Sequence, residues 1–366
     1  MKMQVQKLRE VLKILEPVVP RKTALPVLHN ILLGEGKATA TDLEVKISVV
    51  LPEAKEECLI PFKSVFQMLK YVPGNEIITI KANKMLNISW ESGNSSYALV
   101  DPKDYPAMAK VKPKAKGVLD GDILITAMSS MVNYCATDET RPVLSGVAIL
   151  PGDILDIAAG DGFRMAYQTV PLSFPLEQPL VIPSRAAVIL KHAWDRTPPD
   201  VPPGDSLVKL VTNKRKLEMK LGDELLEVCF GRVTIIIKLI SGNPPNFKQL
   251  IPQDIPLKIQ LFPSDMERAV QRLRVAAKDS EGIIRLNWTK DTMTVSAKSD
   301  EMGNIEATFP VQAEDAGQTA INIRYLLDYL KGKEGLVTMG ITSDKSPIVF
   351  RHRSSPLVII MPMLVK

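Results

Sequence analysis

Three pairs of side chains in this chain have the residue types and the spacing to bind phosphate. The two members of each pair stand seven residues apart, and the pairs are Lys63 and Lys70, Arg185 and His192, and Arg324 and Lys331. Seven residues are about two helical turns, so both members of a pair lie on one face of a helix. Basic side chains repeated in this way predict attraction to a nucleic-acid backbone without readout of its sequence.

Motifs for catalysis are absent from the sequence. It contains no GxSxG elbow, no GxxxxGKS or GxxxxGKT phosphate loop, no HExxH and no GxGxxG after a strand. The histidines and cysteines are few: His29, His192 and His352, and Cys58, Cys135 and Cys229. Their spacing fits neither a metal site nor a disulfide framework. We therefore predict no catalytic residue, no metal and no cofactor.

Asp42, Asp161 and Asp300 occur at similar places in successive parts of the chain and allow two interpretations. They could act as general acids or bases, or they could shape turns by accepting hydrogen bonds from their own backbone. Because the same position recurs, the sequence favours turns.

The basic pairs lie in apolar stretches that predict helices. Leu8, Val11 and Leu15, for example, follow the i, i+3, i+7 pattern of an amphipathic helix. Two helices are expected in each third of the chain, at 4–19 and 61–72, 121–135 and 183–194, and 264–277 and 322–331. Ser264 and Glu267 have the spacing of a capping box, which predicts that the fifth helix begins at Ser264.

Strand patterns separate these helices. Alternation at 216–227 and the β-branched run at 233–240 predict antiparallel strands. The basic stretch 109–117 and the proline-rich stretch 251–256 mark candidate boundaries. The fold class expected is α+β, with three similar domains at 1–116, 117–252 and 253–366, each with two helices and antiparallel sheets.

Composition narrows the class of partner. The chain has 46 Lys and Arg against 41 Asp and Glu, a net charge of +5 that permits contact with nucleic acid. Aromatic residues make up 5% and do not alternate with the charges, which disfavours stacking on single-stranded bases. The sequence has no long apolar run and begins with a charged segment, so we expect a cytoplasmic protein that does not enter a membrane.

Several motifs together carry a resemblance to a known family. They are Leu25-Pro26-Val27-Leu28, the segment from Asp138 to Gly146, Gly160-Asp161-Gly162-Phe163-Arg164-Met165-Ala166, residues 243–252, and Ile359-Ile360-Met361-Pro362-Met363. With these motifs the whole chain resembles the bacterial sliding clamps, the beta subunits of the DNA polymerase III holoenzyme.

The resemblance implies a non-catalytic, head-to-tail homodimeric ring of six domains that encircles duplex DNA in the cytoplasm, at the nucleoid. It implies that the lumen is lined by helices, with DNA-facing residues Lys22, Lys70, Arg141, Arg185, Arg272 and Lys331. It implies that the dimer interface includes Tyr105, Met108, Val275 and Ala277. The expected partners are the replicative polymerase, the clamp loader and repair proteins, which bind through short linear motifs.

The resemblance also implies an apolar pocket for those motifs. Its residues would be Leu144, Gly160, Gly162, Phe163, Arg164, Met165, Pro245, Leu250, Ser346, Ile359, Met361, Pro362 and Met363. The guanidinium of Arg164 is expected to meet polar groups of a bound peptide. Methionine suits a site that accepts several partners, although apolar residues at strand ends are also ordinary core residues. The insert 197–204 and the final Val365 and Lys366 depart from the family pattern.

Two other interpretations stay open. A clamp-like paralogue could have lost the role of main replication clamp while keeping the motifs. A hydrolase on a repeated α+β scaffold belongs to a different class, and the lack of a nucleophile, base and acid set weighs against it.

Overall fold

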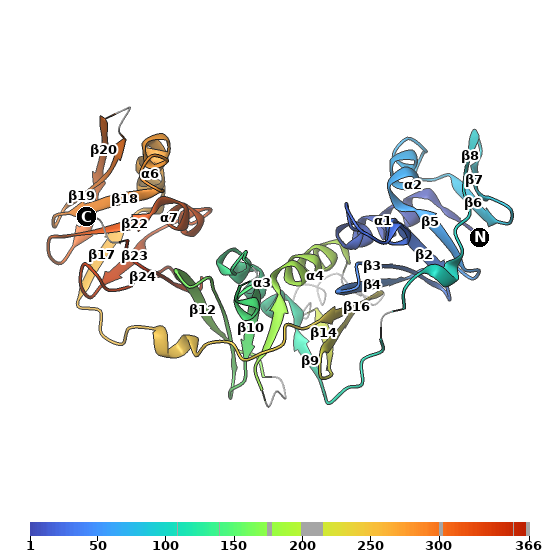
Figure 1. Ribbon diagram of the computed structural model, residues 1–366, viewed down its shortest axis with the longest axis horizontal. Coiled ribbons are helices and arrows are strands. Elements are labelled where there is room, and N and C mark those ends of the chain that lie inside the picture. The colour runs from blue at the N-terminus through green and yellow to red at the C-terminus, as the bar shows by residue number, and fades with distance from the viewer. Residues whose placement is uncertain are drawn as a thin grey trace, which may run out of the picture.

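The computed structural model describes residues 1–107, 109–138, 140–173, 178–198, 215–299, 303–353 and 355–363. The chain forms an arc with its first residues at one end and its last described residues near the other (Figure 1). The labelled helices lie on the concave side of the arc, and the strands form the convex side. We call β1 to β8 the first section, β9 to β16 the middle section and β17 to β25 the last section.

All the helices expected from the hydrophobic pattern are present. They are α1 (Val5–Leu15), α2 (Phe62–Leu69), α3 (Gly121–Met131), α4 (Ser184–Arg196), α6 (Pro263–Ala277) and α7 (Ile323–Leu330). Short 3-10 helices are η1 (Glu16–Val18), η2 (Pro26–His29), η3 (Pro102–Asp104), η4 (Val132–Tyr134), η5 (Pro142–Leu144) and η6 (Phe247–Leu250).

The predicted capping box at Ser264 is wrong. Helix α6 begins one residue earlier, at Pro263, and its N-cap is Phe262, which has no side-chain cap bond. Proline is favoured at the first helical position because its φ is already helical and its missing N–H needs no partner there. Ser264 therefore lies inside the first turn.

Two long antiparallel sheets each join two sections. The first runs β5 (Cys58–Pro61), β2 (Asn30–Gly34), β3 (Lys37–Thr41), β4 (Val45–Val50), β16 (Val233–Lys238), β15 (Leu225–Phe230), β14 (Lys216–Leu221) and β9 (Ala115–Asp120). The second runs β13 (Leu180–Pro183), β10 (Gly146–Leu150), β11 (Leu155–Gly160), β12 (Arg164–Val170), β25 (Leu357–Ile360), β24 (Ile348–Arg351), β23 (Val337–Ile341), β17 (Leu257–Leu261) and β21 (Gln312–Ala313). The strands expected at 216–227 and 233–240 are confirmed.

Two shorter sheets stand at the ends of the arc. One runs β1 (Lys2–Gln4), β6 (Ile77–Ala82), β7 (Leu86–Trp90) and β8 (Gly93–Tyr97). The other runs β20 (Gly303–Pro310), β19 (Thr292–Ser299), β18 (Ile283–Trp288) and β22 (Gly317–Asn322). In the described residues, β8 and β20 each pair on one side only, so each is an edge strand.

The packing of α3 against α4 shows how the concave layer is held. Gly121 opens α3 under Trp194 of α4, and a Cβ at Gly121 would lie 2.1 Å from the indole ring. The indole Nε1 also donates to the carboxylate of Asp122, at 2.9 Å. Only glycine allows the two helices to approach this closely.

The segments proposed as boundaries are partly irregular. Residues 109–114 and 251–256 lie in no helix or strand, but β9 already begins at Ala115, inside the stretch assigned to a linker. The domain division at 116 and 252 stays a prediction. Of the insert 197–204, only Thr197 and Pro198 are among the described residues, and Val365 and Lys366 lie outside them.

Candidate functional site

The repeated aspartates form turns, as predicted. One carboxylate oxygen of Asp42 accepts from the backbone N–H groups of Glu44 and Val45, at 3.0 and 2.7 Å. The equivalent oxygen of Asp161 accepts from the N–H groups of Phe163 and Arg164, both at 2.9 Å. These bonds direct the chain into β4 and β12. Asp300 lies outside the described residues.

Several of the predicted pocket residues form a small apolar cluster apart from the main core. Leu144, Met165 and Ile359 belong to this cluster and are buried. Met165 on β12 and Ile359 on β25 are partners in the strand register, which brings the middle and last sections together here. Sequence reasoning missed Phe247 of η6, which is 3% exposed and packs in the same cluster.

The close approach of Phe247 explains why residue 160 is a glycine. A Cβ at Gly160 would lie 3.1 Å from the Phe247 ring and 3.3 Å from the Cβ of Met165. The glycine lets η6 lie against the sheet, on the convex side of the arc, where η6 is the short yellow helix of Figure 1. The only signal for Phe247 in the sequence was its place within the motif 243–252.

Three exposed apolar residues lie two or three positions along the chain from members of this cluster. Phe163, Leu250 and Met361 are 54%, 54% and 42% exposed. The N–H of Met361 donates to the carbonyl of Phe163 at 2.8 Å, which joins two of these residues directly. We call these three residues, with Leu144, Met165, Phe247 and Ile359, the apolar patch. Exposed apolar surface above a buried apolar cluster is typical of a docking site.

The other predicted pocket residues are less closely tied to the apolar patch. Pro245 and Gly162 are exposed, and Ser346, Pro362 and Met363 are half-buried. Gly162 has a φ of +92°, a conformation that favours glycine, and it lies beneath the guanidinium of Arg141. Ser346 shares a hydrogen bond with Ser343, and the N–H of Met363 donates to the carbonyl of Ala320.

The guanidinium of Arg164, which was expected to meet polar groups of a peptide, is bonded within the chain. The Arg164 side chain is only 4% exposed and forms ion pairs with Asp161, at 3.0 Å, and Asp328, at 2.8 Å. Its guanidinium also lies 4.5 Å from the ring centroid of Tyr325, which stacks on Phe163 of the apolar patch. Its donors are therefore occupied within the chain.

The predicted DNA-facing residues are all exposed, namely Lys22, Lys70, Arg141, Arg185, Arg272 and Lys331. Two members of the basic pairs also hold α4 in place. Arg185 forms an ion pair with Asp42 and donates to the carbonyl of Pro17, and the His192 Nε2 lies 2.7 Å from the carbonyl of Lys13. Arg185 and His192 on α4 thus join the middle section to the first section.

The predicted dimer contacts differ in their exposure in the single chain. Ala277 has no exposed surface, and Tyr105 is 8% exposed, with its hydroxyl accepting from the N–H of Thr41 at 3.1 Å. Burial raises the pKa of Tyr105 to about 12. Both side chains are buried in the single chain. Val275 is 56% exposed, and Met108 lies outside the described residues.

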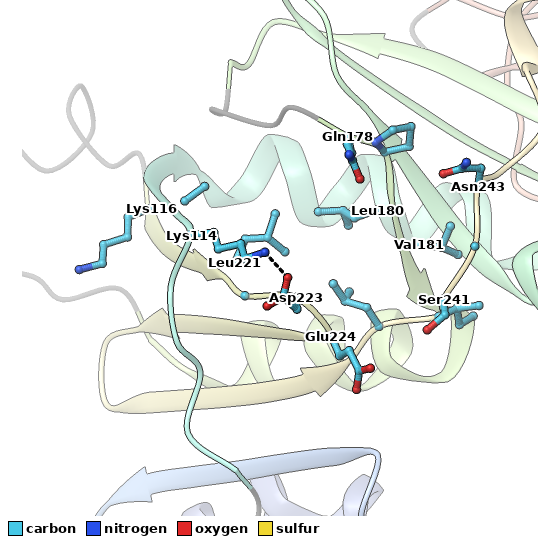
Figure 2. Close-up of a pocket in the computed structure, with 16 residues that line it drawn as sticks. Lys114, Lys116, Gln178, Leu180, Val181, Leu221, Asp223, Glu224, Ser241 and Asn243 are labelled. Carbon is cyan, nitrogen blue, oxygen red and sulfur yellow. Dashed lines mark ion pairs between the residues drawn. The ribbon is translucent and has the colours of Figure 1, made fainter.

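A groove of about 790 Å³ lies elsewhere on the middle section, and no predicted site residue lines it. Figure 2 shows it between Lys114 and Lys116 on one side and Leu180 and Val181 on the other. Lys114 is paired with Asp223 across one end.

Two further features are absent from the residues that the structure describes. These residues contain no group of three His, Cys, Asp or Glu side chains placed to hold a metal ion. Within the same part of the chain, no helix has the length and apolar character needed to cross a membrane.

Comparison with known proteins shows similarity to one family. Residues 248–364 match the family described as DNA polymerase III beta subunit, C-terminal domain. The beta sliding clamp of Chlamydia pneumoniae is 25% identical, over 97% of this chain and 96% of that protein. The beta sliding clamp of Staphylococcus aureus is 22% identical, over 97% and 92%.

Solved structures share the fold over the full length. The DNA polymerase III subunit beta of Pseudomonas aeruginosa superposes with a TM-score of 0.86 at 21% identity, covering 100% of both chains. The sliding clamp of Bartonella birtlesii, solved bound to griselimycin, gives a TM-score of 0.88 at 18% identity, covering 100% of this chain and 99% of that one. The last third of the chain thus matches the DNA polymerase III beta subunit family, and the whole chain is similar in sequence to beta sliding clamps and shares their fold.

Proposed function

We propose that this protein is a sliding clamp, a processivity factor without catalytic activity of its own. Two copies close head to tail into a ring around duplex DNA in the cytoplasm, at the nucleoid. The apolar patch on the convex side binds short linear motifs of the replicative polymerase, the clamp loader and repair proteins. The observation that carries this proposal is the repeated way in which one section of the chain joins the next.

Both junctions within the chain use equivalent strands. β4 follows Asp42 and pairs with β16, the last strand of the middle section. β12 follows Asp161 and pairs with β25, the last strand of the last section. At each junction, the strand after the repeated aspartate pairs with the last strand of the next section. In the last section the strand after the aspartate is β20, and the last strand of the first section is β8. The same pairing would therefore join β20 of one copy to β8 of the next.

Pairing β8 with β20 would also cover two exposed sheet edges. β8 and β20 are edge strands, and an uncovered edge presents unpaired backbone groups that favour pairing with another chain. Joining the two four-stranded end sheets gives an eight-stranded sheet like the one between the first and middle sections. A head-to-tail contact closes a ring when the rotation between copies divides a full turn. In place of Tyr105 and Ala277, we propose that the contact between copies includes Leu99 together with Val275. Leu99 is 42% exposed and follows β8 in the chain.

The basic side chains on the concave side of the arc are suited to a ring that slides along DNA. Exposed Lys70, Arg272 and Lys331 stand on or beside three of the helices that face the inside of the arc (Figure 1). A few basic side chains attract phosphates without reading bases, so the ring stays on DNA but is free to move along it.

The direct test is retention on DNA of different topology. The protein is loaded onto a nicked circular duplex by a clamp loader and separated from free protein by gel filtration at high salt. We expect it to stay on the circle and to leave when a restriction enzyme linearises the DNA. Equal loss from circular and linear DNA would contradict encirclement.

Loss of single lumen charges is expected to weaken DNA binding by the same factor on every sequence. Arg272→Ala and Lys331→Ala should each reduce the slope of log affinity against log salt by about one unit, because one phosphate contact is lost. Fluorescence anisotropy with two duplexes of unrelated sequence measures the slope. Lys84→Ala is the control, since Lys84 is exposed between β6 and β7 and outside the predicted lumen set. An effect that differs between the two duplexes would argue against sequence-independent contact.

A further inference from the structure

Arg164 joins three elements from beneath the apolar patch. Its Nε donates to Asp161 at 3.0 Å, its Nη1 to Asp328 on α7 at 2.8 Å, and its Nη2 to the carbonyl of Asn133 at 2.7 Å. A guanidinium buried to this degree is tolerated when its donors are bonded and its charge is paired. The three bonds therefore fix the position of this side chain.

Aromatic rings enclose the same group. The Arg164 guanidinium lies 4.5 Å from the ring centroid of Tyr325 and 5.3 Å from that of Tyr134. Tyr325, on α7, also stacks on Phe163, with centroids 6.5 Å apart. Cation–π contacts strengthen when they are shielded from water, as they are here. Helix α7 thus touches both Arg164 and its neighbour in the patch.

The residues on either side of Arg164 belong to the apolar patch. The carbonyl of Phe163 accepts from the N–H of Met361, and Met165 packs in the buried cluster with Ile359. Because the three residues are consecutive, a shift of Arg164 moves both neighbours. The geometry of the patch is coupled in this way to the position of α7.

Of the three hydrogen-bond partners of Arg164, Asp328 alone comes from the last section of the chain. We propose that Asp328 is a positioning residue for the peptide site: it holds Arg164 against α7 and thereby sets the placement of Phe163 and Met165. This inference rests on the proposed peptide-binding function of the patch. Asp328 is not one of the residues of the apolar patch, and its side chain is 36% exposed.

The chain contains a matched control for an ion pair between sections. Asp42 of the first section pairs with Arg185 of the middle section, as Arg164 of the middle section pairs with Asp328 of the last. The residues that make up the apolar patch do not include either member of the Asp42 pair. Asp42→Asn keeps an oxygen for the turn and weakens the pair, so it measures the general effect of loosening a junction.

The experiment compares the full-length wild type with Asp328→Asn, Asp328→Glu and Asp42→Asn. The probe is a fluorescent synthetic peptide with the C-terminal sequence of the replicative polymerase from the same organism, and binding is measured by anisotropy. Arg164 keeps Asp161 in each Asp328 variant, so the fold is expected to persist, which thermal unfolding checks. We expect Asp328→Asn to bind about tenfold more weakly, a loss within the range for mutations that act through a coupled network.

Rescue distinguishes positioning from mere loss of stability. Asp328→Glu should recover most of the affinity because it restores the carboxylate, and Asp42→Asn should bind as the wild type does. Wild-type affinity in Asp328→Asn would overturn the inference while leaving the proposed function intact, and so would equal weakening in Asp42→Asn. A wild type that does not bind the peptide would overturn the proposed peptide site itself, and the inference with it.

Discussion

Glutamate in place of both Leu99 and Val275 is expected to convert the proposed dimer into monomers. The two side chains are 42% and 56% exposed in the single chain and are proposed to lie in the contact between copies. Closing the ring over two carboxylates would bury charge without a partner, which costs several kcal/mol. Sedimentation velocity should show the wild type at about twice the chain mass of 40.4 kDa and the double variant at the chain mass.

The matched control for ring closure is Val50→Glu with Ile154→Glu. These residues are 45% and 48% exposed, and neither lies in one of the two end sheets. The control should remain a dimer, which would show that added negative charge alone does not separate the copies. A Leu99 and Val275 double variant that still sediments as a dimer would place the interface somewhere else.

Removal of the exposed apolar side chains from the patch should abolish most peptide affinity. Met361→Ala with Leu250→Ala is expected to cost about 2 kcal/mol or more, roughly a thirtyfold loss, because a few anchor contacts dominate such interfaces. Both side chains are more than two fifths exposed, so their truncation leaves no internal cavity. Met165→Ala would also weaken the peptide site, but Met165 is 5% exposed and its loss would destabilise the fold as well.

Calorimetric titration with the polymerase peptide measures this loss, beside a sedimentation run that checks the ring. Ile77→Ala is the control, since Ile77 is 61% exposed on β6 of the first section. It should leave peptide affinity unchanged. Unchanged affinity in the Met361 and Leu250 double variant would remove the apolar patch from the account of partner binding.

Much of the fold was predictable because its signals are local. Each helix follows from a period of apolar residues over a few turns, and the strands at 216–227 follow from alternation. The turns at Asp42 and Asp161 follow from a side chain that bonds backbone two and three residues on. The wrong capping box at Ser264 arose because proline and the capping box made competing local predictions.

The site was predictable only in part. The motifs indicated Leu144, Met165 and Ile359, which the fold does gather into one cluster. The motif 243–252 contains Phe247 but did not mark it as a pocket residue, because an aromatic side chain by itself carries no sign of which sheet it will cover. The burial of Tyr105 was not predicted either, since nothing near it in sequence reveals that its hydroxyl meets the backbone of Thr41.

By itself, the sequence determined the repeated helices, strands and aspartate turns and the mild positive charge, since each depends on composition or on residues a few positions apart. Only the tertiary structure decided how these parts are used. It paired Arg164 with Asp328, 164 residues further along the chain, and left β8 and β20 as edges at the two ends of the arc. Many acidic side chains could form an ion pair with a buried arginine, and many strands could pair with a given strand. The choice among them comes from the packing of the whole chain, which no local pattern encodes.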